Sequence, residues 1–171
     1  ETSYIKYYPV NNGDQSLISV HENSYRTNIM IDCNIRESSK GDDDKTKYDV
    51  KNDLLKVLGK RKISSIENVS YTDIFVLTHW DDDHLHGFKN NFYQGDPKNY
   101  KQKNKDSGEI FIDVLWFSPM VMGPSTNDDE DCFNKEAKRR INLHKDKSPD
   151  KNLPGNRIVI IGYDADEKLD G

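Results

Sequence analysis

Apolar and polar residues alternate along the first part of the chain. Tyr4–Val10 alternates and is rich in aromatic residues, and Ser16–His21 and Asn28–Cys33 continue the same strand character. A period of two is typical of strands with one buried face. Asn11–Asp14 separates the first two strands with a strong turn signal. We therefore expect the chain to open with a small antiparallel meander.

Two later segments repeat with the 3.6-residue period of an amphipathic helix. The apolar face of the first is formed by Val50, Leu54, Val57 and Leu58. Gly59 is a good helix terminator, and the cationic residues 60–62 suit the negative end of the helix dipole. The face of the second helix is formed by Phe133, Ala137, Ile141 and His144. This helix is acidic at its start and basic at its end, as the dipole prefers.

Continuous apolar runs indicate strands that are buried on both faces. Such runs occupy Ile74–Thr78, Ile110–Phe117 and Arg157–Tyr163. Polar, charged loops are expected at residues 37–47, 96–108 and 145–154. Strands with helices between them predict a mixed α/β (α+β) fold in which helices cover a sheet. We treat residues 1–171 as a single domain.

Composition adds a thin core and an acidic charge to this picture. Apolar residues make up 33% of the 171 residues and charged residues 32%, so long charged loops should surround an ordered core. The formal net charge of −5 argues against a protein that coats nucleic acid through a basic surface. An enzyme acting on phosphodiesters remains compatible with this charge, because bound metal ions supply positive charge locally.

Cysteine content and hydropathy bear on the compartment. Cys33 and Cys132 lack paired-motif spacing, so we expect no disulfide framework and a reducing environment. Cys33 lies in an apolar strand, where a buried structural thiol is its expected role. We find neither a signal peptide nor an apolar run long enough to cross a bilayer. These features predict a soluble, cytoplasmic protein with no membrane partner.

Potential metal ligands are crowded directly after the first of the apolar runs. Residues 78–87 read Thr-His-Trp-Asp-Asp-Asp-His-Leu-His-Gly. Imidazole and carboxylate groups suit zinc, iron and manganese, and neighbouring carboxylates repel one another unless a cation lies among them. The spacing lets His79 and Asp81 share one metal. Asp83 and His84 can face a second metal, and two metals about 3.5–4 Å apart can hold a bridging hydroxide.

Two simpler interpretations of the acidic run stay open. Aspartates that follow a strand can form the first turn of a helix, where capping and the helix dipole favour them. Asp81–Asp83 can also form a calcium or magnesium loop, although histidine is a poor partner for those hard ions. The density of ligands and their position at a strand end favour a transition-metal site over both.

The run resembles the His-x-[His/Asp]-x-Asp-His signature of the metallo-β-lactamase superfamily, in the branch that includes bacterial DNA-uptake proteins. Upstream, Val10–Asp14 is similar to the Val-Gly-x-Gly-Asp turn of that branch, and Ile31–Asn34 is similar to its Ile-Asp-Cys-Gly strand end. The resemblance covers roughly the first 90 residues by motif and the rest by element order only. It implies a metallo-β-lactamase-type αββα sandwich, of which this chain would form the N-terminal half.

The resemblance also implies roles for individual residues. His79 and Asp81 would bind the first metal, and Asp83 and His84 the second. Asp83 would also act as the catalytic residue that accepts a proton from the nucleophilic water. Asp32 would support the site from the neighbouring strand end. The implied cofactors are two divalent metal ions, zinc first, with manganese and iron as alternatives.

The chain departs from the family pattern after His84, where the further metal ligands of the family are expected. His144 lies on a helix face, Asp164 and Asp166 are more typical of a turn, and His86 is more typical of an exposed helix residue than of a ligand. Each metal would therefore have two protein ligands, whereas catalytic zinc usually has three. We expect the domain to be incomplete at its C-terminus, inactive by itself, and completed by a further domain or by homo-oligomerisation.

These observations favour a metal-dependent hydrolase that uses a metal-bridging hydroxide. Phosphodiesters of nucleic acid or nucleotides are the first choice of substrate, which would make the protein a nuclease or phosphodiesterase. Acyl or thioester hydrolysis is an alternative within the same chemistry. A non-catalytic interaction module of the same fold is a second hypothesis, because the ligand set is incomplete.

Overall fold

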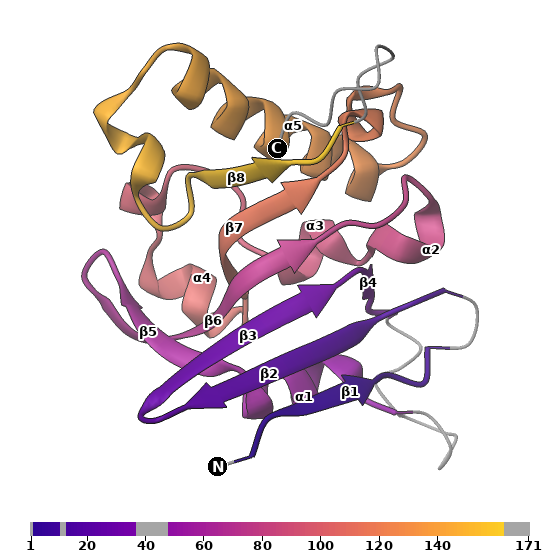
Figure 1. Ribbon diagram of the computed structural model, residues 1–171, viewed down its shortest axis with the longest axis vertical. Helices are drawn as coiled ribbons and strands as arrows, with labels where there is room; N and C mark the ends of the chain where they lie inside the picture. The colour runs from indigo at the N-terminus through magenta and orange to yellow at the C-terminus, as the bar shows by residue number, and fades with distance from the viewer. Residues whose placement is uncertain (1, 11–12, 37–47, 163–171) are drawn as a thin grey trace.

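The computed structural model describes residues 2–10, 13–36 and 48–162. Seven strands form one sheet in the order β1-β2-β3-β6-β7-β8, with β5 paired to β6 (Figure 1). Their bounds are β1 Tyr4–Tyr7, β2 Ser16–Glu22, β3 Tyr25–Ile31, β5 Gly59–Ile63, β6 Ile66–Val76, β7 Phe111–Phe117 and β8 Arg157–Ile160. Strands β1, β2 and β3 form the predicted antiparallel meander, and β3, β6, β7 and β8 run parallel.

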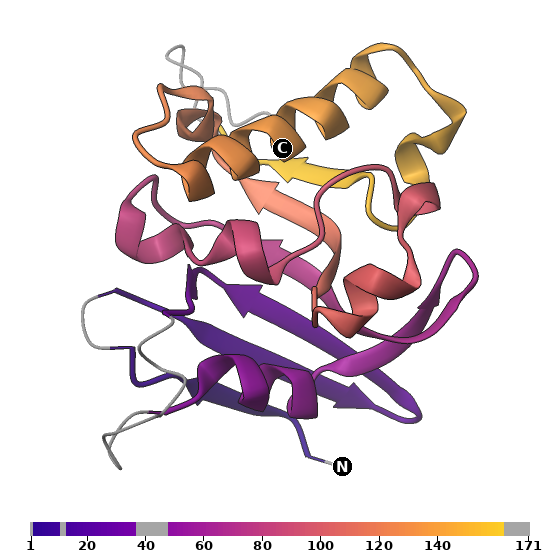
Figure 2. The same ribbon diagram turned by 180° about the vertical axis from the view of Figure 1, so that it is seen from behind.

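The helices lie on one face of this sheet (Figures 1 and 2). Their bounds are α1 Val50–Val57, α2 Asp82–Leu85, α3 Phe88–Asn91, α4 Gln102–Asp106 and α5 Asp128–Lys145. Short 3-10 helices cover Pro97–Asn99, Pro119–Met122 and Pro149–Asn152. The mixed α/β class is therefore confirmed. Among the described residues, no helix is both long enough and apolar enough to cross a membrane.

Helix α1 ends just before Gly59, as predicted, but the chain then forms a strand that was not predicted. Leu58 is already extended at the helix C-cap, and residues 60–62, which we assigned to the helix dipole, belong to β5. This strand pairs antiparallel with β6, which begins at Ile66 rather than at Ile74. The middle residues of β5 are exposed and cationic, as is typical of an edge strand that avoids aggregation. Such an edge lacks the apolar alternation on which the prediction relied.

Two segments predicted as polar loops contain short helices instead. The segment 96–108 includes a 3-10 turn and α4, and the segment 145–154 includes the 3-10 turn 149–152. Tyr100 anchors the first segment, because its side chain is buried and its ring contacts those of Tyr93 and Phe111. One buried aromatic ring within a polar segment therefore holds the chain against the core.

Strand β8 was predicted to be buried, and it is not. Val159 and Ile160 are 40% and 39% exposed, because β8 is the last strand of the sheet in the part of the chain that the structure describes. Its neighbour β7 carries Trp116, which is half-buried rather than part of the core. Tyr163, the predicted end of this strand, lies outside the described residues.

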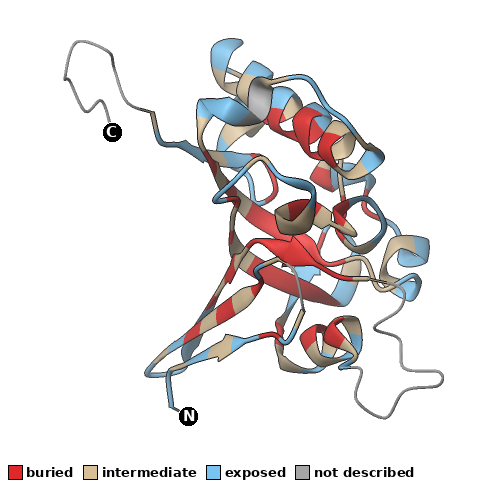
Figure 3. Ribbon diagram, turned by 90° about the vertical axis from the view of Figure 1, so that its right-hand side faces the viewer, coloured by how far each residue is buried: buried red, intermediate tan, exposed pale blue. Residues whose placement is uncertain are grey.

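The core lies between the sheet and the helices. The row Lys6, Leu17, Met30, Phe75 and Leu115 crosses five paired strands, and the last four of these are fully buried. Phe133 of α5 and Phe88 of α3 cover Phe75 with ring contacts of 6.1 Å and 5.5 Å between centroids. Figure 3 shows the buried residues on the central strands and on the helix sides that face them.

The opposite face of the sheet is apolar but has no described helix over it (Figure 1). One row on this face is Ile5, Ile18, Ile29, Ile74 and Val114, joined strand to strand by the pairing register. The next row contains Tyr7, Ile31, Val76, Trp116 and Val159. These residues are half-buried or exposed. A continuous apolar face of this kind is typical of a surface that meets another layer of structure.

Candidate metal centre

The predicted ligands lie where two neighbouring strands end. β6 ends at Val76, and Asp81, whose backbone is extended, is the N-cap residue of α2. Strand β4 (Cys33–Asn34) continues from β3 and forms parallel bridges to Leu85 and His86. The ends of β3 and β6 therefore hold residues 78–86 from both sides, at the carboxyl edge where open α/β sheets place their sites.

Asp32 is the buried centre of this arrangement. Its side chain is 2% exposed and its backbone is left-handed, with φ 57°. Its Oδ1 accepts a hydrogen bond from the backbone N–H of Thr78 at 2.8 Å. Its Oδ2 accepts the Thr78 hydroxyl and lies 2.9 Å from His84 Nδ1. A carboxylate only accepts hydrogen bonds, so the proton of the His84 ring lies on Nδ1. Nε2 is then the nitrogen with a lone pair available to a metal.

His79 is oriented through Thr78. The Thr78 hydroxyl lies 2.9 Å from His79 Nδ1. A hydroxyl has one proton, which Thr78 donates to Asp32, so it accepts from the Nδ1–H of His79. The rings of His79 and His84 lie 4.9 Å apart between centroids. Both imidazoles are therefore held through Nδ1, with Nε2 free on each.

Three of the four predicted ligands converge directly. One ligand atom from each of Asp81, Asp83 and His84 lies within 4.8 Å of the other two. His84 Nε2 is 3.8 Å from Asp83 Oδ1. His79 is not part of this group by its ligand atoms, although its ring lies beside that of His84. This mixture of imidazoles and carboxylates suits a divalent transition metal.

The interpretation of the acidic run as the first turn of a helix is correct in position, because Asp82 and Asp83 lie in the first turn of α2. Asp81 is the N-cap residue of α2, yet its side chain makes no capping hydrogen bond. Helix α2 has only four residues, so its dipole offers little stabilisation to three carboxylates. Asp82 faces elsewhere, because its Oδ1 accepts a hydrogen bond from Asn127 Nδ2 at 3.1 Å. Capping therefore does not explain why Asp81 and Asp83 lie beside His84.

The electrostatics of the site favour positive charge. Burial lowers the pKa of His84, but the hydrogen bond and charge of Asp32, together with the charges of Asp83 and Asp14, raise it overall above its ordinary value. These carboxylates therefore favour the protonated imidazole of His84, which Asp32 contacts directly. A cation in the same place would experience the same attraction.

Gly13 lies directly against the motif. Gly13 has φ +112°, and a Cβ on it would lie 2.4 Å from the backbone oxygen of Asp83. Asn34 Nδ2 donates to the same oxygen at 2.9 Å. Only glycine permits this approach. Gly13 and Thr78 are both visible in the sequence, as a glycine in a turn and as the residue before His79. The sequence alone does not predict that either of them supports the site.

The remaining histidines and cysteines of the described residues lie away from the cluster. His86 was predicted to be an exposed helix residue, but it is the extended C-cap residue of α2 and is half-buried. His144 Nε2 faces the backbone oxygen of Asn156 at 3.3 Å. Cys33 is fully buried, and burial raises the pKa of its thiol, which agrees with a structural role. Asp164 and Asp166 lie outside the described residues.

Comparison of the chain with protein-family models, with curated proteins and with solved structures finds no match. The case for a metal centre therefore depends on the geometry of the site itself.

Proposed function

We propose that this protein is a metal-dependent hydrolase whose metals are held by His79, Asp81, Asp83 and His84. The observation that carries the proposal is the hydrogen bonding of Asp32. It binds His84 Nδ1 directly and reaches His79 Nδ1 through Thr78. A carboxylate that fixes the tautomer of a histidine is the usual support of a metal-binding imidazole. A histidine on a solvated surface needs no such support.

We further propose that the fold is a metallo-β-lactamase-type αββα sandwich. The order of elements and the single layer of helices support this assignment. The apolar rows on the open face of the sheet, including Ile18, Ile29 and Ile74, support a second sheet packed upon it. In such a fold the second half would supply the further ligands that each metal needs.

Two divalent ions at this site, with zinc as first choice, would lower the pKa of a bound water and polarise a substrate oxygen. Asp83 is our candidate for the group that accepts the proton of the attacking water. Its carboxylate is half-buried and its Oδ1 lies 3.8 Å from His84 Nε2. General bases of this type contribute about 10²–10⁴-fold to the rate.

Phosphodiesters of nucleic acid or nucleotides are the proposed substrates. The carboxylate in the third position of the motif and the branch that it resembles motivate this choice. The net charge of −5 means that attraction of an anionic substrate would come from the metals rather than from a basic surface.

The test is hydrolysis of bis(4-nitrophenyl) phosphate and of a simple thioester by the zinc- or manganese-loaded protein, expressed from its complete reading frame. We expect turnover of the phosphodiester, with Asp83→Asn lowering kcat about 100-fold or more. Asp82→Asn is the matched control, because its side chain bonds to Asn127 and not to the cluster, and it should retain the wild-type rate. Turnover of the thioester alone would reassign the substrate. A metal-loaded protein inactive on both would contradict the proposed activity.

A further inference from the structure

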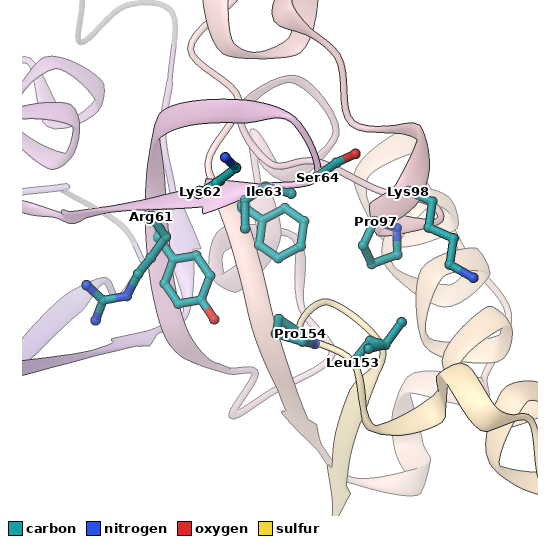
Figure 4. A pocket seen from close by; sticks show the side chains of 10 residues that line it. Arg61, Lys62, Ile63, Ser64, Pro97, Lys98, Leu153 and Pro154 are labelled. Carbon is teal, nitrogen blue, oxygen red and sulfur yellow. The ribbon is translucent and has the colours of Figure 1, made fainter.

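A hollow lies at the end of the sheet opposite the candidate metal centre. It has a volume of about 310 Å³ (Figure 4). Its walls come from β5, the middle of β6, the start of β7, and the segments around Pro97 and Pro154. Tyr71 and Val76 of β6 are five residues apart, about 16 Å along a strand, and the metal motif begins beyond Val76. The hollow is therefore separate from the candidate metal centre.

The floor of the hollow is aromatic and rigid. The rings of Tyr71 and Phe111 are stacked, with centroids 5.7 Å apart and planes inclined by 15°. Both side chains are buried from bulk solvent, at 6% and 1% exposure. The Tyr71 hydroxyl donates to Asp113 at 2.6 Å, which fixes the ring. Tyr93 is also stacked against Phe111, and Arg61 lies over the Tyr71 ring, so an apolar group in the hollow would meet rings that are already held in place.

The sides of the hollow are apolar as well. Ile63 on one side faces Pro97, Leu153 and Pro154 across the opening (Figure 4). Leu153 is 39% exposed, although it is a leucine in a segment that is otherwise polar. An exposed leucine beside two prolines and two aromatic rings forms a surface that a ligand would cover.

The rim of the hollow is cationic. Lys62 and Lys98 point their charged ends away from the apolar part (Figure 4), whereas the Arg61 guanidinium lies over the Tyr71 ring, 5.6 Å from its centroid. None of the ten described residues that line the hollow is acidic.

Each cation has an acidic neighbour beyond the rim. Lys62 pairs with Glu67 and Lys98 with Asp150, both at 2.6 Å, and Arg61 lies 4.0 Å from Asp73. The side chains of both lysines are about 60% exposed, and exposed pairs of this kind are weak. The lysines can therefore exchange these partners for an anion at the opening.

We propose that this hollow binds a small organic anion with a flat apolar body, of the class of aromatic carboxylic acids. The apolar body would lie between Ile63 and Leu153, against the part of Tyr71 and Phe111 that lines the hollow. The carboxylate would remain at the rim, within reach of Lys62 and Lys98. The volume is at the small end of ligand sites, which fits a body of one or two fused rings.

The experiment is a calorimetric titration of the protein with 2-naphthoate and with its neutral analogue 2-naphthalenemethanol. We expect saturable binding of naphthoate and binding about five-fold weaker for the alcohol, the difference that a weak charge contact provides. The Lys62→Ala/Lys98→Ala protein should bind both compounds equally. Lys135→Ala is the matched control, since Lys135 is an exposed lysine paired with Asp131 on α5, and it should behave as wild type.

Leu153→Trp tests the location, because a larger side chain at this exposed position fills the hollow without entering the core. We expect it to weaken naphthoate binding at least tenfold, and amide shifts in the wild type should concentrate at Tyr71, Phe111 and Leu153. Equal affinity for the acid and the alcohol would overturn the anion specificity. Unchanged binding by Leu153→Trp would overturn the location, as would shifts confined to the open sheet face. Metal binding enters none of these outcomes, so they are independent of the proposed hydrolase.

Discussion

Asp32 and Gly13 adopt backbone conformations that most residues avoid, and both lie against the candidate metal centre. Asp32 has φ 57° and Gly13 has φ +112°. Aspartate tolerates the left-handed region better than most residues, and glycine adopts it freely. In both cases the conformation brings the chain to the motif: Asp32 to His84, and Gly13 to the backbone of Asp83. Strain of this kind is often concentrated at functional sites.

A Gly13→Ala substitution should destabilise the protein, because the new Cβ would lie 2.4 Å from the Asp83 oxygen in a conformation that alanine disfavours. We expect the free energy of unfolding, measured by urea denaturation, to fall by about 1–3 kcal/mol. Gly59→Ala is the control. Its φ is not left-handed and its new Cβ would have Asn28 Nδ2 as its nearest contact, at 3.4 Å. Equal stability of the two variants would show that the turn at Gly13 does not support the motif.

The individual candidate ligands were readable from the sequence because their chemistry is dense: two histidines and three aspartates lie within residues 79–84. The role of Thr78 could not be read from the sequence, because a threonine after an apolar strand is common. Its function depends on a hydrogen bond to Asp32, which is 46 positions away in the chain. Contacts between distant residues of this kind have no local signature.

At the scale of elements, helix α1 is attached to strand β1 by one carboxylate. Asp53 accepts hydrogen bonds from the Tyr8 hydroxyl at 2.9 Å and from Lys6. Burial raises the pKa of Asp53, but hydrogen bonds from Lys6, Tyr48 and Tyr8 outweigh it, and the pKa is lowered overall. The ionised form is therefore favoured in the folded protein relative to the unfolded chain, where the pKa of an aspartate is about 3.9.

This attachment should make stability depend on pH. The contribution of Asp53 is present above the unfolded pKa of about 3.9 and is lost as the pH falls through the lower folded pKa. In Asp53→Asn we expect a smaller free energy of unfolding at neutral pH, by about 1 kcal/mol, and a shallower loss of stability in acid. Chemical denaturation between neutral and acidic pH measures both. Glu67→Gln, an exposed residue on β6, should keep the wild-type profile, and an unchanged profile in Asp53→Asn would refute the role of this contact.

The meander and the two longest helices, which have a buried apolar face, were predicted, whereas strand β5 and helix α4, which lack one, were missed. The meander and the helices α1 and α5 follow from residues such as Leu17, Leu54 and Phe133, which are all fully buried. Strand β5 was missed because residues 60–62 are exposed cations on an edge. Helix α4 was missed because it has no buried residue of its own and is held by Tyr100, which precedes it. Periodicity detects burial, so it does not detect an element that is held by its neighbours.

At the scale of the whole molecule, the two faces of the sheet differ. Helices cover one face, whereas the other presents the apolar rows through Ile18, Ile29 and Ile74. The fold class was predictable from the order of strands and helices, but the exposure of β8 was not, because burial depends on which layers meet. The same open face supports the proposed sandwich, in which the metal centre would lie at the shared edge of two sheets.

The most direct test of the central claim is to measure zinc binding by the purified protein, using equilibrium dialysis and elemental analysis. The account predicts that His84→Ala and Asp32→Asn each lower zinc affinity about 10–100-fold, because one removes a ligand and the other its support. His144→Ala, whose imidazole faces the backbone of Asn156, should bind zinc as the wild type does. Wild-type protein that takes up no zinc, or the same zinc affinity in all four proteins, would contradict the existence of this metal centre.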